Sequence, residues 1–159
     1  MEELKKKRVS DSRTEHVEMI LFQHINGFKR LFGGQLMAWI DMVGGVTARR
    51  HAGGEVTTVA VDNLVFSEPV TVNSTIVLIG EVTFTGRTSM EVRVDTYEET
   101  MSGERKRVNR AYLVFVAMGE DQRPVPVPGL ILETEEQKRE FENGEIRQQL
   151  RKSRRQKGI

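Results

Sequence analysis

The sequence of 159 residues contains no cysteine. This absence excludes disulfide bonds, thiolate metal sites and cysteine nucleophiles, and it fits a reducing compartment. No apolar run approaches the roughly 18 residues that a membrane helix needs. The charged residues 1–8 also lack the apolar stretch of a secretory signal peptide. We therefore expect a cytoplasmic protein with no membrane partner.

An excess of charge of one sign is also missing, because 24 basic residues balance 23 acidic ones and leave a net charge of +1. Such a balance gives no global field that would draw the protein to nucleic acid. The three histidines, His16, His24 and His51, are scattered and show no metal-ligand spacing. Nucleophile-elbow, Walker and dinucleotide-binding glycine motifs are absent as well. We expect no nucleic-acid partner and no metal site.

A long helix is expected over residues 33–50. One face of it collects residues at three- and four-residue spacing, namely Leu36, Met37, Ile40, Val43 and Thr47. The cations at residues 49–51 complement the helix dipole, and the glycine pair at residues 53–54 is a stop signal. Gly44 and Gly45 each cost about 1 kcal/mol relative to alanine inside a helix. We predict that they permit close packing against a sheet or a second helix.

Strands are expected on both sides of this helix. The ranges are residues 14–22 before it and residues 56–66, 75–84, 90–97 and 107–117 after it. The short connections between the last four predict antiparallel hairpins. Within residues 90–95, apolar residues alternate with charged ones, which predicts a strand with one buried and one solvated face. A strand, a long helix and then four strands describe the α+β hot-dog architecture.

The remaining segments flank this domain of residues 14–128. Residues 1–13 are polar and are expected to be flexible, and the proline-rich residues 123–129 are expected to end the sheet. Thr134-Glu135-Glu136-Gln137 has the capping-box pattern and begins a C-terminal helix within residues 129–159. Residues 147–157 carry six cations and no acid. This basic tail is interpreted as a solvated helix end, with attraction of phosphate-bearing ligands or nucleic acid as the alternative.

Asp41 is the leading candidate for a catalytic group. A single acid inside an apolar helix is a poor helix former, and its neighbours Met37, Trp39, Ile40 and Gly45 are apolar or small. Apolar surroundings disfavour the charged carboxylate and make it a stronger base. Asp41 is therefore a candidate general base or nucleophile, with an ordinary exposed helical acid as the alternative.

Gly33 and Gly34 are candidate oxyanion donors. The first N–H groups of a helix have no partner within the helix, and glycine lets a carbonyl oxygen approach the backbone. Gly34 and Asp41 share a helix face, but seven residues span about 10 Å along the axis. We infer that the donors and the acid which meet on one substrate come from two subunits, so that a homodimer is the minimal active unit.

Two loops add further candidates. Asn26 precedes the helix, where its amide is suited to orient a water molecule or hold a carbonyl oxygen, or where it is an ordinary turn asparagine. The hairpin turn with Arg87, Thr88 and Ser89 combines a cation, two hydroxyls and free N–H groups, a composition that suits a phosphate. On composition alone, an ordinary solvated turn is the favoured interpretation.

Five sequence blocks resemble one known family, the hot-dog acyl-CoA thioesterases of the bacterial YciA and mammalian brain acyl-CoA hydrolase type. They occur in order over about residues 14–128. The blocks are Phe32-Gly33-Gly34 followed by Trp39-Ile40-Asp41, then Val56-Thr57-Thr58-Val59-Ala60-Val61-Asp62, Phe66-x-x-Pro69-Val70, Gly86-Arg87-Thr88-Ser89-Met90 and Phe115-Val116-Ala117.

This resemblance implies hydrolysis of acyl-CoA to a free acid and CoA without a metal or organic cofactor. It implies that Asp41 is the base or nucleophile, with Asn26 placed across the dimer from it. Gly33 or Gly34 would polarise the carbonyl, and the turn with Arg87, Thr88 and Ser89 would lie near the CoA phosphates. The assembly implied is a hexamer, a trimer of dimers.

Two alternatives use the same fold. A hot-dog dehydratase requires a histidine with an acid, and no histidine lies near Asp41 in the sequence. A non-catalytic acyl-CoA sensor would keep the pocket without turnover. Robust hydrolysis would exclude the sensor, whereas binding without hydrolysis would favour it.

Overall fold

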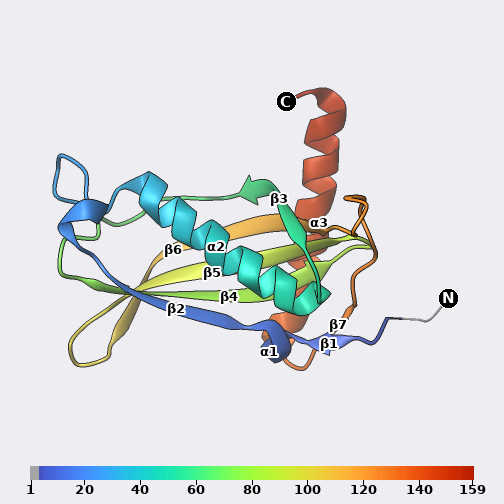
Figure 1. Cartoon of the computed structure of the whole chain (residues 1–159), viewed down its shortest axis with the longest axis horizontal. Coiled ribbons are helices and arrows are strands. Elements are labelled where there is room, and N and C mark those ends of the chain that lie inside the picture. The colour runs from blue at the N-terminus through green and yellow to red at the C-terminus, as the bar shows by residue number, and fades with distance from the viewer. Residues whose placement is uncertain (1–3) are drawn as a thin grey trace.

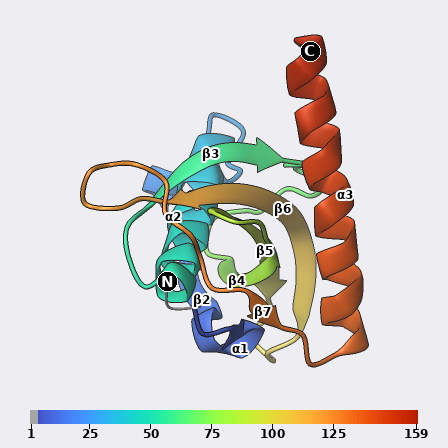
Figure 2. The ribbon, with the colours of Figure 1, turned by 90° about the vertical axis from the view of Figure 1, so that its right-hand side faces the viewer.

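In the computed structural model, which describes residues 4–159, a five-stranded antiparallel sheet wraps around one long helix (Figures 1 and 2). The strand order is β2-β4-β5-β6-β3. The strands are β2 (Thr14–Met19), β4 (Thr75–Thr85), β5 (Ser89–Glu99), β6 (Arg105–Ala117) and β3 (Val56–Asp62). The central helix is α2 (Gly33–Ala52), and a second long helix, α3 (Glu135–Lys157), covers the opposite face of the sheet. The predicted hot-dog architecture is confirmed, but the hairpin predicted between β3 and β4 is wrong, because β3 pairs with β6 at the other side of the sheet.

Helix α2 begins and ends close to where the sequence predicts. Its last residue, Ala52, is followed by Gly53 in the left-handed conformation at φ 73°, and the Gly53 N–H donates to the Arg49 carbonyl oxygen. Four of the five residues expected on its apolar face are buried against the sheet: Leu36, Ile40, Val43 and Thr47. The fifth, Met37, is exposed and lies at the edge of the buried face.

The glycines inside α2 allow it to approach the sheet closely. A Cβ atom added to Gly44 would lie 3.0 Å from the ring of Phe115, a residue that is fully buried on β6. A Cβ atom added to Gly45 would meet the same ring at 3.8 Å, which is an ordinary contact distance. The predicted packing of this glycine pair against a sheet is therefore confirmed, and Gly44 is the residue that requires it.

We predict opposite effects for alanine at these two neighbouring positions. Gly44→Ala should lower the free energy of unfolding by about 1–3 kcal/mol, because Phe115 has no space to move into. Gly45→Ala should raise it by about 0.5–1 kcal/mol through helix propensity alone. Denaturant unfolding of the two variants measures both effects. Equal stabilisation by both substitutions would contradict the close contact.

Part of the N-terminal segment packs against the rest of the chain. Strand β1 (Lys7–Arg8) pairs in parallel with β7 (Leu130–Ile131), and the helical turn α1 (Val9–Ser12) follows directly, with Val9 in the hydrophobic core. These contacts join residues 7–12 to a strand more than 120 residues away in the sequence. The expected flexibility of residues 1–13 stays a prediction, and residues 1–3 lie outside the described part of the chain.

A buried histidine ties the end of α2 to the segment before β7. The Nε2 of His51 donates to the carbonyl oxygen of Pro128 at 2.7 Å. Burial lowers the pKa of His51 below its ordinary value, so the neutral ring is favoured in the folded protein.

Strand β5 departs from the prediction of one solvated face. Its charged residues Glu91, Arg93 and Asp95 are buried, as are Met90 and the other apolar residues that alternate with them. The reason is helix α3, which lies across the face of the sheet opposite α2 (Figure 2). Glu91 and Arg93 therefore meet α3 rather than solvent, whereas Asp95 pairs with Arg110 on β6.

Helix α3 begins with a side-chain cap, as predicted. The Thr134 hydroxyl accepts from the backbone N–H of Gln137 at 3.1 Å. The reciprocal half of the capping box differs slightly, because the Gln137 side chain accepts from the N–H of Glu133 rather than from that of Thr134. This small shift leaves the predicted start of the helix unchanged.

Part of the basic tail is not a solvated helix end. Arg147 makes two hydrogen bonds to the fully buried carboxylate of Glu91, at 2.9 and 2.7 Å. Its guanidinium also stacks 3.7 Å from the ring centroid of Tyr112. Arg151 contacts both Glu91 and Asp62, at 3.6 and 3.2 Å. The two arginines therefore compensate carboxylates on β5 and β3 and attach α3 to the sheet.

Removing Arg147 should strongly destabilise the protein. Arg147→Leu would leave Glu91 with an incompletely compensated buried charge, and we expect a loss of about 3 kcal/mol in the free energy of unfolding. The double variant Glu91→Gln/Arg147→Leu should lose less, because the charge is removed with its partner. Arg139→Leu, at an exposed α3 position, should stay within about 0.5 kcal/mol of wild type. Denaturant unfolding compares the variants, and an additive loss in the double variant would contradict this account.

Candidate active site

Asp41 lies halfway along α2 and is held by a side chain from β3. The Thr58 hydroxyl donates to Asp41 Oδ1 at 2.7 Å. Since one carboxylate oxygen accepts from Thr58, the other remains available to a water molecule or a substrate. The sequence does not single out Thr58 for this role. Its place inside a family-like block was the available signal, but the contact depends on how α2 lies over β3.

The acid lines an apolar cavity of about 350 Å³. The cavity lies between α2 and the strands β3 and β6, and most of its lining is aliphatic or methionine: Met37, Ala38, Ile40, Val61, Leu64 and Leu113. Gly34 and Thr58 complete it together with Asp41. An apolar chain beside a carboxylate and a hydroxyl is the kind of ligand that such a lining accommodates.

Within a single chain the Asp41 carboxylate is exposed. The burial that the sequence predicts for this acid is therefore not supplied by its own chain. Large apolar side chains are exposed around it on α2, on β3 and in the loops beside them: Phe32, Met37, Met42, Val59, Val61 and Phe66. We call this set the α2–β3 apolar surface. Met37 and Val61 also line the Asp41 cavity, and gatherings of exposed apolar side chains are typical of interfaces.

The start of α2 carries free backbone donors. The N–H groups of Gln35 and Leu36 donate to the carbonyl oxygen of Phe32. Among residues 4–159 the N–H groups of Gly33 and Gly34 have no such acceptor, as expected for the first positions of a helix. Both glycines are therefore placed to present donors to a ligand.

Asn26 occupies a tight turn before α2. Its Oδ1 atom accepts from the N–H groups of Phe28 and Arg30, at 2.9 and 3.3 Å. These bonds fix the side-chain oxygen and leave the Nδ2 donors without an acceptor in the described chain. Asn26 therefore has both a turn-forming role and free donors.

The candidate residues fall into two separate cavities of the single chain. Asn26 and Gly33 line a second cavity of about 460 Å³, which also includes Phe66. Gly34 and Asp41 line the first one. Neither of these two cavities combines Asn26 with Asp41, so the two residues line different cavities of a protomer.

The turn with Arg87, Thr88 and Ser89 joins β4 to β5. The sheet register places it near the acid: Thr58 pairs with Phe115 on β6, and Phe115 pairs with Met90 on β5. Two strand spacings put Met90 about 10 Å from Thr58. The turn immediately precedes Met90, so it lies within reach of a long ligand whose other end contacts Asp41.

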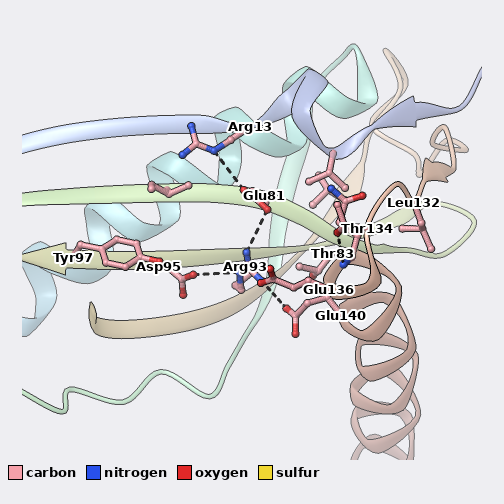
Figure 3. A pocket seen from close by; sticks show the side chains of 14 residues that line it. Arg13, Glu81, Thr83, Arg93, Asp95, Tyr97, Leu132, Thr134, Glu136 and Glu140 are labelled. Carbon is pink, nitrogen blue, oxygen red and sulfur yellow. Dashed lines mark hydrogen bonds and ion pairs between the residues drawn. The ribbon is translucent and has the colours of Figure 1, made fainter. Parts of the chain in front are cut away.

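A further cavity of about 370 Å³ lies on the opposite face of the sheet, below the start of α3 (Figure 3). Arg93 stands at its centre and contacts Glu81, Asp95 and Glu140 at 3.1–3.3 Å. None of the predicted site residues lines it. Its ion pairs join α3 to the sheet, and we assign it a structural role.

Residues 4–159 contain no group of three histidine or acidic side chains that is placed to hold a metal ion. No helix among them combines the length and the apolar character required to cross a membrane.

The chain is similar to proteins of one family. Residues 28–103 match the model of the thioesterase superfamily. The chain is 39% identical over 113 residues to YkhA of Bacillus subtilis, named as an uncharacterized acyl-CoA thioester hydrolase; the match covers 70% of this chain and 66% of YkhA. The match to the rat cytosolic acyl coenzyme A thioester hydrolase, at 33% identity, covers 83% of this chain but only 35% of that protein. The chain thus spans less than two thirds of these curated relatives.

Solved structures match over nearly the whole chain. A hexameric acyl-CoA thioesterase in its apo form is 37% identical with a TM-score of 0.90, and the match covers 95% of this chain and 97% of that one. An acyl-CoA hydrolase of Staphylococcus aureus, solved with butyryl coenzyme A and coenzyme A, is 30% identical with a TM-score of 0.91 over 96% and 94% of the two chains. The chain therefore belongs to the hot-dog acyl-CoA thioesterase family of the thioesterase superfamily.

Variants of the Staphylococcus aureus enzyme have also been solved. They replace an asparagine, an aspartate and a threonine by alanine, at positions 15 and 17 residues apart in that order. Asn26, Asp41 and Thr58 have the same residue types and the same spacing in this chain.

Proposed function

We propose that this protein hydrolyses the thioester of acyl-CoA to a free carboxylic acid and CoA. The observation that carries the proposal is the Asp41 carboxylate, oriented by Thr58 at the wall of an apolar cavity. The acyl chain would occupy the cavity, and the thioester carbonyl would lie beside the acid. The pantetheine arm of CoA is long and extended, which fits the separation between this acid and the turn with Arg87, Thr88 and Ser89.

In the reaction, water supplies the oxygen of the new carboxylic acid. Asp41 takes a proton from water as its oxygen attacks the thioester carbon, and the tetrahedral intermediate then expels the CoA thiolate, which receives the proton. Alternatively, Asp41 attacks the carbon itself, expels the thiolate and forms an anhydride that water hydrolyses. Single turnover in ¹⁸O-labelled water tests the second route, because label in Asp41 arises only when water attacks the Asp41 carbonyl of an anhydride. Label in the product acid alone fits direct attack of water or attack on the acyl carbonyl of the anhydride.

The developing oxyanion requires donors that Asp41 cannot provide. The free N–H groups of Gly33 and Gly34 at the start of α2 have the required chemistry, and so does the Nδ2 of Asn26. Gly34 lies about 10 Å from Asp41 along the helix axis, and Asn26 lines the other cavity. We infer that Asp41 of one subunit acts with Asn26 and the helix start of its partner.

Two features of the chain support a dimer that brings these parts together. Strand β3 ends the strand order, so one of its sides has no neighbouring strand within the described residues. Such an open edge is suited to pair with a second chain. The α2–β3 apolar surface includes two residues of this edge strand, Val59 and Val61, and two of its members, Met37 and Val61, line the Asp41 cavity. Its coverage by a second chain would bury the acid, and three such dimers would give the hexamer seen for the related thioesterase.

Substitution at Asp41 should remove the chemical step. We predict that Asp41→Ala lowers kcat by about two to four orders of magnitude with little change in KM, because the lost interaction belongs to proton transfer. Thiol release from a panel of acyl-CoAs, from short to long chains, measures this effect and also gives the chain-length preference. Binding of acyl-CoA by the wild type without thiol release would favour the sensor.

Thr58 should act as a positioning residue. Thr58→Val removes the hydroxyl that orients Asp41, and we expect kcat to fall about 10-fold to 100-fold, as for a lost hydrogen bond to a charged group. The neighbouring Thr57→Val is the matched control, because Thr57 does not contact Asp41 and should leave kcat within about twofold. Equal rates for the Thr58 and Thr57 variants would contradict the assigned contact.

A further inference from the structure

Helix α3 passes directly beside the turn that joins β4 to β5. A Cβ atom added to Gly86, at the start of this turn, would lie 3.2 Å from the Nε2 atom of Gln148. The side chain of Gln148 therefore lies against the turn backbone, next to Arg87, Thr88 and Ser89. The contact joins segments 62 residues apart in the sequence.

The helix face that carries Gln148 continues with two cations. Lys152 and Arg155 follow at four and seven residues, so they lie on the same face of α3, toward its C-terminal end. Both are exposed. Their backbone positions lie about 6 and 10 Å beyond Gln148 along the helix, and their long side chains can extend back toward the exposed Arg87 of the turn.

These cations differ from the other arginines of α3. Arg147, Arg151 and Arg154 point to the sheet, where the carboxylates of Glu91 and Asp62 neutralise them. Neither Lys152 nor Arg155 has a carboxylate within ion-pair distance among residues 4–159. The positive charge on this flank of α3 is therefore uncompensated and available to an anion.

The chemistry of the turn points to the kind of anion. Thr88 and Ser89 provide hydroxyl donors, and Arg87 provides a guanidinium, which are groups that bind phosphate oxygens. Lys152 and Arg155 add two further charges on one side. The turn and α3 together offer five such donor side chains, three of them positively charged. This number is larger than a ligand with a single negative charge needs, and it matches a ligand with several phosphate groups.

We propose that Gln148, Lys152 and Arg155 of α3 complete the phosphate-binding site of the turn, so that α3 contributes to recognition of the phosphorylated nucleotide of CoA. This inference rests on the proposed function, because it assumes an acyl-CoA whose thioester lies at Asp41. In this arrangement α3 holds the end of the substrate farthest from the reacting carbon. Its cations strengthen binding and take no part in the chemical step.

The test compares two double variants of equal charge. Lys152→Gln/Arg155→Gln removes the two cations beside the turn, and Lys138→Gln/Arg139→Gln removes two exposed cations from the N-terminal half of the same helix. Each variant of the full-length protein is assayed with an acyl-CoA and with the matching S-acyl-pantetheine, which has no phosphates. Glutamine keeps the helix propensity nearly constant in all cases.

We expect Lys152→Gln/Arg155→Gln to raise KM for acyl-CoA about tenfold at low salt. This is the loss of affinity expected when two exposed ion pairs to the substrate are removed. KM for S-acyl-pantetheine should rise no more than in the control variant. The difference for acyl-CoA should shrink as added salt screens the wild-type contacts. An equal rise for both substrates would indicate a structural effect and overturn the proposal, and so would a response to acyl-CoA no larger than that of the control.

Failure of the proposed function has a different signature. If the wild-type protein releases no thiol from any acyl-CoA, hydrolysis is contradicted, and calorimetric titration with CoA itself then decides the α3 site. Weaker CoA binding by Lys152→Gln/Arg155→Gln than by the control would support the site without the reaction. Equal binding by the two variants would overturn the site.

Discussion

The close packing of α2 onto the sheet is the constraint on which the rest of the structure depends. Gly44 lets the helix approach the Phe115 ring, and this contact fixes how α2 lies over the strands. The same placement brings Asp41 within hydrogen-bond distance of Thr58 on β3. It also leaves the start of α2, with its free N–H groups, about 10 Å from the acid. This separation is the basis of our proposal that Asp41 acts with the helix start and Asn26 of a second chain.

Helix α3 shields the second face of the sheet from solvent. Antiparallel sheets often have one solvated face, but here α3 covers that face and is attached to it by ion pairs. Glu91 lies at the centre, with Arg147 and Arg151 above it. Buried pairs of this kind contribute less to net stability than their number implies, but breaking one of them is costly. They fix the position of α3 beside the turn at Gly86, and this position makes a binding role for its exposed cations possible.

Most of the central fold was predictable from the sequence. Helical spacing and glycine stop signals located α2, and alternation with short turns located the strands, because these patterns are local. The packing of α3 on the second face of the sheet was not predictable. Glu91 and Arg93 on β5 have the pattern of solvent-facing residues, and their partners on α3 lie about 50 residues away in the sequence. The pairing of β1 with β7 was not predictable for the same reason, because the two strands are more than 120 residues apart. Among the site residues, Asp41 was recognisable by type and context, whereas the role of Thr58 depends on a contact between a helix and a strand.

The shared active site is the central claim, and complementation between two inactive variants tests it most directly. Asn26→Ala and Asp41→Ala subunits, co-expressed with different tags and purified as mixed oligomers, would each supply the residue that the other lacks. If the site spans two subunits, mixed oligomers should recover a substantial fraction of wild-type thiol release, because one of the two sites in each heterodimer is intact. If mixed oligomers remain as inactive as either parent, Asn26 and Asp41 act within one chain and the account is contradicted.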